Sequence, residues 1–182
     1  MEQIDTSIGV HAPDFELPGT DGKVHHLGRY LREDLAVAVV FLANQCPNVQ
    51  QYIERLKQLQ AEFGDRGLLV IGINSNDGSE SPEDSLEAMK RFAAEHQLNF
   101  PYLRDANQDV ARSFQVCQTP ESFLLDQKGV IRYHGAIDDS PGNSHEVDSA
   151  YLQQAIAQLL AKESITINST ETKGSSVKWR SP

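Results

Sequence analysis

The stretch that decides the fold runs from Leu35 to Gln50 and reads LAVAVVFLANQCPNVQ. Its first half, Leu35 to Leu42, is an unbroken apolar run of strand length that is rich in valine. Such a run predicts a strand buried on both faces, as in a parallel sheet. Polar residues end the run, and Cys46 follows them directly.

A helix is expected immediately after Cys46. Pro47 suits the first position of a helix, where its missing N–H costs nothing. Apolar residues then recur at helical spacing, at Val49, Tyr52, Ile53, Leu56, Leu59 and Phe63. The N-terminus of a helix favours negative charge, and the thiolate is the reactive form of cysteine. On this spacing alone Cys46 is either a reactive thiol or a small buried core residue, and both interpretations stay open.

Length and composition set the broad class of the protein. The chain has 182 residues, a net charge of −10 and 39% hydrophobic residues, which fits one domain with a core. The negative charge argues against binding to nucleic acid or to an anionic membrane. No apolar run approaches the roughly 20 residues that span a bilayer. The acidic N-terminus, MEQIDTSIGV, has no apolar segment typical of a secretory signal, so we expect a cytoplasmic protein with its two cysteines as thiols.

The order of the expected elements predicts an α/β fold. An N-terminal β-hairpin turns at Asp21-Gly22, a second buried strand covers 68–73, and a helix begins after Ser81 as its N-cap. Further along we expect a short strand at 99–103, a short helix at 107–114, a β-hairpin at 123–134 and a helix at 148–161. This order is a thioredoxin-like three-layer α/β/α arrangement with a central mixed sheet. We expect one domain over 1–162, followed by a tail or surface strap over 163–182.

Several short motifs, taken together and in order, identify a family. The first set is Ala-Pro-Asp-Phe at 12–15, Asn-Gln-Cys-Pro at 44–47, Thr-Pro-Glu at 119–121, and Gly129. A narrower set is N-x-C-P-x-V-Q at 44–50, G-I-N-x-N-D at 72–77, F-P-Y-L-x-D at 100–105, C-x-T-P-E at 117–121 and I-D-D at 137–139. On these motifs the chain resembles, nearly end to end, the thioredoxin-like redoxins of the alkyl hydroperoxide reductase and thiol-specific antioxidant (AhpC/TSA) family. The narrower set matches a subgroup with the N-x-C-P motif.

The resemblance implies a redox site. In the family, the proline that matches Pro120 is a cis-proline that lies against the reactive cysteine. A cis Thr119–Pro120 bond facing Cys46 is therefore expected. The resemblance also implies a peroxide or disulfide substrate, and an external thiol reductant such as a thioredoxin-like protein. It implies neither a cofactor nor a metal.

The chain also departs from the patterns of its relatives. Val49 stands where thioredoxins carry the second cysteine of C-x-x-C, and Val39 and Ala43 replace the proline and threonine of the peroxiredoxin motif P-x-x-x-T-x-x-C. The hydroxyl that helps to hold the peroxide is thus absent at Ala43. Members of the subgroup often carry a cysteine near the C-terminus, where this chain has Ser175. These departures weaken a peroxidase interpretation and exclude a cycle that uses a tail cysteine.

Cys117 is the candidate for a second thiol. It lies three residues before Pro120, on the loop that the fold brings toward Cys46. Cys46 would attack an oxidant or a substrate disulfide, and Cys117 would resolve the product. Alternatively Cys117 is too far away, because a disulfide needs Cα atoms within about 7 Å. Both interpretations stay open.

The other candidate site residues position the substrate or tune the thiol. Glu121 beside the cis-proline could accept the thiol proton, could oppose the thiolate, or could be a solvated charge at the rim. Thr119 is expected to offer backbone hydrogen bonds to an extended substrate, and Asn44 either orients the loop or caps the helix. Arg132 and His134 are candidate positive neighbours, although a strand side chain that faces solvent is the commoner case.

Two functions of different classes fit these residues. The first is a thiol-dependent oxidoreductase with Cys46 as nucleophile toward peroxides or disulfides. The second is a thioredoxin-like binding module that has lost turnover, which Val49 and the missing threonine favour. The combination of Cys46, Thr119-Pro120 and Cys117 favours the oxidoreductase, and this is the function that we expect.

Overall fold

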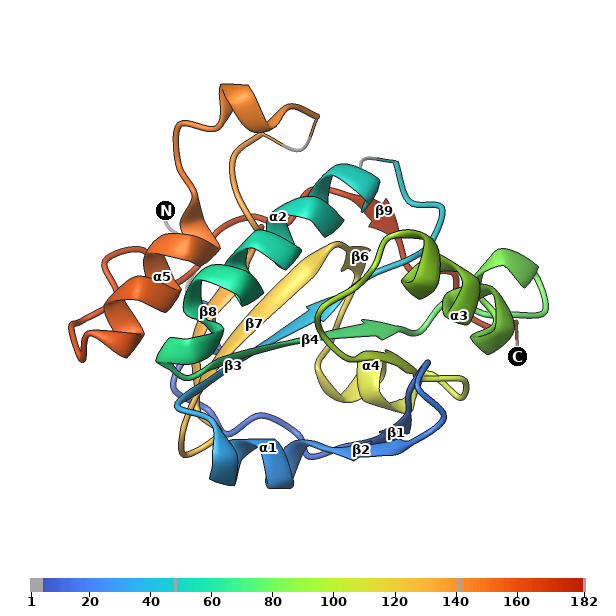
Figure 1. Cartoon of the computed structure of the whole chain (residues 1–182), viewed down its shortest axis with the longest axis horizontal. Helices are drawn as coiled ribbons and strands as arrows, with labels where there is room; N and C mark the ends of the chain where they lie inside the picture. The colour runs from blue at the N-terminus through green and yellow to red at the C-terminus, as the bar shows by residue number, and fades with distance from the viewer. Residues whose placement is uncertain (1–4, 48, 141, 182) are drawn as a thin grey trace.

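The apolar run after Leu35 forms the central strand of a five-stranded mixed sheet in the computed structural model, which describes residues 5–47, 49–140 and 142–181 (Figure 1). This strand, β3 (Ala36–Phe41), is buried along its whole length, as the sequence predicted. The strand order is β5-β4-β3-β7-β8, and β3 pairs parallel with β4 but antiparallel with β7. The other four strands are β4 (Leu68–Asn74), β5 (Tyr102–Arg104), β7 (Glu121–Asp126) and β8 (Ile131–Gly135).

Helices cover both faces of this sheet because successive residues of β3 point to opposite sides. Ala36, Ala38 and Val40 join a core cluster with α2 (Val49–Phe63), α3 (Leu86–Glu95) and α5 (Tyr151–Leu160). Val37, Val39 and Phe41 join a second cluster that includes residues of α1 (Leu27–Glu33) and α4 (Asp109–Ser113). Figure 1 shows these two layers on either side of the strands. The predicted three-layer α/β/α arrangement with a thioredoxin-like order is confirmed.

The N-terminal hairpin is also confirmed. Strands β1 (Glu16–Pro18) and β2 (Val24–His26) pair antiparallel, and Phe15 and Leu17 are buried in the second core cluster. Two short 3₁₀ turns complete the connections, η1 (Gly64–Arg66) after α2 and η3 (Ser144–Glu146) before α5. Among the described residues, no helix is both long and apolar enough to cross a membrane.

Two expected helix starts are wrong. Ser81 does not cap α3; it precedes a separate 3₁₀ turn, η2 (Pro82–Asp84), and makes no side-chain cap hydrogen bond. The cap of α3 is Ser85, whose hydroxyl accepts a hydrogen bond from the Ala88 N–H at 3.2 Å. Pro47 is not the first residue of α2, which is described from Val49 onward. Pro47 lies in a turn instead, and the Val49 N–H donates to the Cys46 carbonyl at 3.0 Å.

A segment near the C-terminus pairs with the residues just before Pro120 in a separate two-stranded sheet. Strand β9 (Ser175–Ser176) pairs antiparallel with β6 (Gln118–Thr119), and Val177 is buried in the second core cluster. We call residues 174–178 the C-terminal strap. The strap brings a segment near the C-terminus next to the junction of β3 and α2 (Figure 1).

Candidate active site

The Cys46 sulfur lies where three segments meet. Its Sγ is 3.1 Å from the carbonyl oxygen of Thr119, 3.3 Å from the hydroxyl oxygen of Ser175 and 3.5 Å from the carbonyl oxygen of Pro47. These contacts come from the Pro120 loop, the C-terminal strap and the turn that leads into α2. Cys46 as a residue is only 7% exposed. The sulfur is therefore held in a fixed and largely covered position.

The Thr119–Pro120 peptide bond is cis, as the resemblance implied. Thr119 is buried, and its carbonyl oxygen is the closest of the three acceptors to the Cys46 sulfur. The backbone of Thr119 was expected to receive an extended substrate. In the structure Thr119 instead pairs with Ser175 of the strap, so a segment of the chain itself occupies the place expected for the substrate.

The three groups around the sulfur differ in what they can do for a thiolate. The two carbonyl oxygens can only accept a hydrogen bond, so they can pair only with the protonated thiol. The Ser175 hydroxyl can accept from the thiol or donate to the thiolate. The N-terminal end of the 15-residue helix α2 adds a field that favours negative charge. Ser175 therefore supplies a hydroxyl next to the sulfur. Ala43, which stands at the threonine position of the peroxiredoxin motif, has no hydroxyl to supply.

Sequence reasoning missed Ser175 as a site residue. The Cys46–Ser175 contact joins residues 129 positions apart in the sequence. The one signal that pointed to it was the tail cysteine of the subgroup, which Ser175 replaces. That signal argued only against a catalytic cycle and did not indicate contact with Cys46.

Asn44 orients the loop that carries Cys46. Its N–H donates to the Asp84 carboxylate at 2.8 Å, and its side-chain amide donates to the Glu83 carbonyl at 2.6 Å. Its side-chain oxygen accepts from the Tyr102 hydroxyl at 2.7 Å. These bonds fasten the loop to η2 and β5. Of the two roles considered for Asn44, this geometry matches orientation of the loop.

Glu121 is part of a buried polar group on the other side of the cis-proline. Only 5% of Glu121 is exposed, so it is not a solvated charge at the rim. Its carboxylate lies 3.2 Å from His134 Nε2 and accepts from the Cys117 N–H at 3.2 Å. His134 Nδ1 in turn lies 2.6 Å from the Asp5 carboxylate. Glu121 thus positions the backbone at Cys117, and within the described residues its hydrogen bonds are with Cys117 and His134 and not with Cys46.

Asp5 and Glu121 affect the pKa of His134 through these hydrogen bonds, and His134 in turn affects the pKa of Asp5. Burial alone would lower the pKa of His134, but hydrogen bonds with Glu121 and Asp5 outweigh burial and raise it. Burial would raise the pKa of Asp5, but hydrogen bonds from Ser7, Ser169 and His134 lower it to about 2. Arg132, the other candidate positive neighbour, is instead paired with Asp126 on the surface.

The two thiols differ in exposure. Cys46 and Cys117 are both free, and Cys117 is exposed whereas Cys46 is buried. The Cys117 thiol approaches the Gln115 carbonyl at 3.8 Å, and its N–H is held by Glu121. Within the described part of the chain, the hydrogen-bonding contacts of the two sulfurs share no partner.

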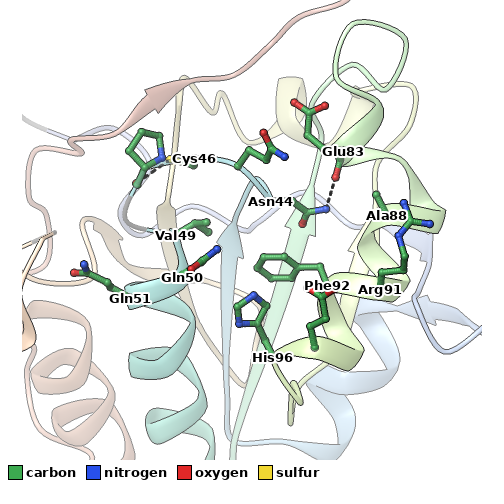
Figure 2. A pocket seen from close by; sticks show the side chains of 13 residues that line it. Asn44, Cys46, Val49, Gln50, Gln51, Glu83, Ala88, Arg91, Phe92 and His96 are labelled. Atoms are coloured by element: carbon green, nitrogen blue, oxygen red, sulfur yellow. Dashed lines mark hydrogen bonds between the residues drawn. The ribbon is translucent and has the colours of Figure 1, made fainter.

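A groove of about 620 Å³ opens beside Cys46, between the start of α2 and α3 (Figure 2). Figure 2 shows side chains from both helices around one space, with Cys46 at its upper end and His96 at its lower end. Most of the lining side chains are polar. The lining residues are Asn44, Gln45, Cys46, Pro47, Val49, Gln50, Gln51, Glu83, Ala88, Arg91, Phe92, Glu95 and His96. Asn44, Cys46 and Pro47 were candidates from the sequence, whereas the α3 side of the groove was not foreseen.

Comparisons with known proteins agree with this architecture. The chain is 29% identical over 131 residues to thioredoxin-like protein YneN of Bacillus subtilis, covering 72% of each protein. It is 25% identical over 131 residues to thiol-disulfide oxidoreductase ResA of Geobacillus kaustophilus, covering 72% of this chain and 70% of ResA.

Solved structures match over still more of the chain. The crystal structure of hypothetical protein SMc02350 from Sinorhizobium meliloti 1021 superposes with a TM-score of 0.91 at 33% identity, covering 98% of both chains. Peroxidoxin BcpB from Mycobacterium tuberculosis shares the fold, with a TM-score of 0.68 at 23% identity over 86% of this chain and 98% of BcpB. A family model described as the AhpC/TSA family matches residues 8–134. With its thioredoxin-like fold and its redoxin relatives, the chain belongs to the AhpC/TSA family.

Proposed function

We propose that the protein is a thiol-dependent oxidoreductase, an antioxidant-type redoxin whose nucleophile toward peroxides or disulfides is Cys46. The observation that carries the proposal is the position of the Cys46 sulfur. It lies just before α2 and 3.3 Å from a hydroxyl that can donate to a thiolate, and Cys46 is one of the residues that line the groove between α2 and α3. Membership of the AhpC/TSA family and the similarity to a protein named thiol-disulfide oxidoreductase support the same class of reaction.

Both proposed reactions begin with attack by the Cys46 thiolate. With a peroxide, the Cys46 thiolate attacks one oxygen, the O–O bond breaks, and the leaving oxygen takes up a proton to become an alcohol or water. Cys46 is oxidised to the sulfenic acid and the peroxide is reduced. With a disulfide, the thiolate attacks one sulfur, the S–S bond breaks, and a mixed disulfide and a free thiol result.

A second function, a thioredoxin-like binding module without turnover, has specific observations in its favour. Val49 takes the place of a second cysteine, and only 7% of Cys46 is exposed. A binding module needs no reactive thiol, so the reactivity of Cys46 distinguishes the two functions.

The test compares wild type with Cys46→Ser and Cys117→Ser. Each protein is treated with hydrogen peroxide, the sulfenic acid is trapped with dimedone, and the modified cysteine is identified by peptide mass spectrometry. We expect Cys46 to react at least about tenfold faster than free cysteine, in keeping with an activated thiolate. Cys117→Ser should keep this rate and Cys46→Ser should lose it. A Cys46 that reacts no faster than free cysteine would favour the binding module.

A further inference from the structure

We propose that the C-terminal strap is an autoinhibitory segment that holds the place of an extended polypeptide disulfide at Cys46. Such a polypeptide must displace the strap before its disulfide can reach the Cys46 sulfur. Because this role rests on the proposed function of Cys46, the polypeptide is a substrate of the same thiol. Three features of the strap support it: what the strap covers, which groups hold it, and which of its side chains face the protein.

The strap covers both the Cys46 sulfur and the backbone before the cis-proline. Ser175 Oγ lies 3.3 Å from Cys46 Sγ, and only 7% of Cys46 is exposed. Strand β9 of the strap pairs antiparallel with β6, which places Ser175 opposite Thr119. An extended polypeptide that adds to a strand uses the same backbone N–H and C=O groups. The strap and such a polypeptide therefore compete for one place on β6.

Beyond β9, the strap is held by polar groups that are themselves buried. The Lys178 N–H donates to the Asn76 side chain at 2.9 Å, and the Lys178 carbonyl accepts from the Asp77 N–H at 2.9 Å. The same carbonyl accepts from the Gln108 side-chain amide at 2.9 Å. Asn76, Asp77 and Gln108 are buried, so a strap that leaves deprives their polar groups of these partners. The closed strap is therefore the favoured state, and a segment that restores these bonds replaces it at the lowest cost.

Another polypeptide could restore these bonds because they use the backbone of the strap. Besides the two groups of Lys178, the Val177 N–H donates to the Cys117 carbonyl at 3.0 Å. Every residue except proline carries the same N–H and C=O groups. The choice between the strap and a substrate therefore depends on the side chains that the site accepts.

Three residues of the strap define what could replace it. Gly174 lies so close to β6 that a Cβ there would collide with the Thr119 carbonyl. Residues two apart on an extended chain point to the same side, and both Ser175 and Val177 face the protein. Ser175 contacts Cys46, and Val177 is 5% exposed in the second core cluster. The fitting substrate is thus a polypeptide disulfide whose cysteine follows a glycine and stands two residues before an apolar side chain.

Once such a segment has displaced the strap, its cysteine takes the place of Ser175 beside the Cys46 sulfur. The Cys46 thiolate attacks the sulfur of that cysteine, the S–S bond of the polypeptide breaks, and the other sulfur leaves as a thiolate that takes up a proton. Cys46 and the polypeptide are then joined in a mixed disulfide. The polypeptide disulfide is the oxidant in this step, and the Cys46 thiolate supplies the electron pair.

The first experiment measures displacement of the strap without any reaction at Cys46. A fluorescent peptide that copies residues 172–180 is titrated with full-length protein, and its fluorescence anisotropy gives the Kd. We expect Gly174→Ala and Val177→Asp to bind this peptide about tenfold or more tightly than wild type does, because their straps leave β6 more often. A peptide with the valine replaced by aspartate should bind none of these proteins.

Each strap variant has a matched control. Gly28→Ala has room for its Cβ and Val24→Asp lies at an exposed position, so both should bind the peptide as weakly as wild type does. If Val177→Asp does not fold, Gly174→Ala tests the strap by itself, because its new Cβ forces the strap away from Thr119.

The second experiment measures the reaction of Cys46. Each protein carries Cys117→Ser, so that Cys46 is its one thiol. The peptide now has a cysteine in the place of Ser175, activated as a mixed disulfide with thiopyridine, and dithiodipyridine is the small reference disulfide. The ratio of the two rate constants cancels the intrinsic reactivity of Cys46, which a loosened strap also changes. We expect this ratio to rise about tenfold or more in Gly174→Ala and Val177→Asp, and to stay unchanged in the matched controls.

The outcomes separate the autoinhibitory role from the proposed function. Equal peptide affinity in wild type and both strap variants would overturn the autoinhibitory role, and so would an equal ratio of rate constants. If the strap variants bind the peptide tightly but Cys46 attacks neither disulfide, the proposed function fails, whereas competition between strap and polypeptide for β6 is supported.

Discussion

At the scale of single residues, one of the three groups in contact with the Cys46 sulfur can donate a hydrogen bond. Carbonyl oxygens of Thr119 and Pro47 surround Cys46 Sγ and cannot stabilise a thiolate, whereas the Ser175 hydroxyl can donate to it. A hydrogen bond to a charged group contributes about 1.5–3 kcal/mol. Ser175 should therefore contribute to the reactivity of the Cys46 sulfur.

Removing the Ser175 hydroxyl should markedly slow the alkylation of Cys46. We expect Ser175→Ala to lower the rate of Cys46 alkylation by iodoacetamide at pH 7 by about tenfold, because the thiolate loses its donor. Ser176→Ala is the matched control, since Ser176 is the exposed neighbour in the same strand and should leave the rate unchanged. Equal rates in the two variants would show that the Ser175 hydroxyl does not act on the sulfur.

Single residues of the site differ in how far the sequence could predict them. Cys46 could be found because a buried strand followed by a helix is a local pattern, and the helix N-terminus at their junction favours negative charge. Ser175 could not be found that way, because its contact depends on the path of a tail with weak periodicity. Glu121 was placed correctly beside the cis-proline, but its partners, His134 and Asp5, come from distant segments.

At the scale of elements, Asp84 ties three segments to one another. It is 1% exposed and its carboxylate accepts from the Asn44 N–H at 2.8 Å, from the Asn74 side chain at 2.9 Å and from the Asn76 side chain at 3.1 Å. These bonds join η2 to the end of β4 and to the loop before Cys46. Burial lowers the pKa of the neighbouring Arg104, and the Asp84 charge opposes that shift.

Neutralising Asp84 should therefore weaken the packing of η2 against the end of β4 and the loop before Cys46. We expect Asp84→Asn to lower the free energy of unfolding by about 2–4 kcal/mol, because buried donors lose a charged acceptor and Arg104 loses a compensating charge. Urea denaturation measures this change, and Asp109→Asn, on the exposed first turn of α4, is the control. An Asp84→Asn protein as stable as wild type would contradict the role given to this carboxylate.

The same network explains why one helix start was predicted wrongly. Ser81 and Ser85 both precede acidic residues, so local capping rules favour either as the start of α3. The structure uses Ser85 because Asp84 is drawn inward to bond Asn44 and Asn74, which ends the turn before the helix begins. Those partners lie on other elements, and no local pattern reports them. The sheet and the remaining helices were predictable because their apolar periodicity is local.

For the molecule as a whole, a segment near the N-terminus and the first part of the tail after α5 meet at β8. Asp5 near the N-terminus bonds His134 of β8 and accepts from the Ser169 hydroxyl at 2.7 Å. The Thr170 N–H donates to the His134 carbonyl at 3.1 Å, so the tail follows this strand before it reaches Cys46. The order of strands and helices did not predict this meeting, because the terminal segments lack a periodic pattern. Asp5, His134 and Ser169 form a polar cluster that joins the N-terminal segment to the tail, and we call this cluster the latch.

This latch should make stability depend on pH. The raised pKa of His134 means that its contribution is complete below the unfolded value of about 6.5 and is lost as the pH rises through the folded value. The pKa of Asp5, lowered to about 2, means that its contribution is present above about 3.9 and is lost as the pH falls through about 2. The latch should therefore be strongest between about pH 4 and about pH 6.5.

The measurement is urea unfolding of wild type and His134→Gln at pH 6 and at pH 9. Wild type should be more stable than the variant at pH 6, and this difference should shrink at pH 9 because neutral His134 no longer forms an ion pair with Asp5 and Glu121. His145→Gln, an exposed histidine in η3, is the control and should follow wild type at both pH values. An equal difference at both pH values would mean that His134 is not charged within the latch. In that case Asp5 and Ser169 would be joined to β8 by neutral hydrogen bonds alone.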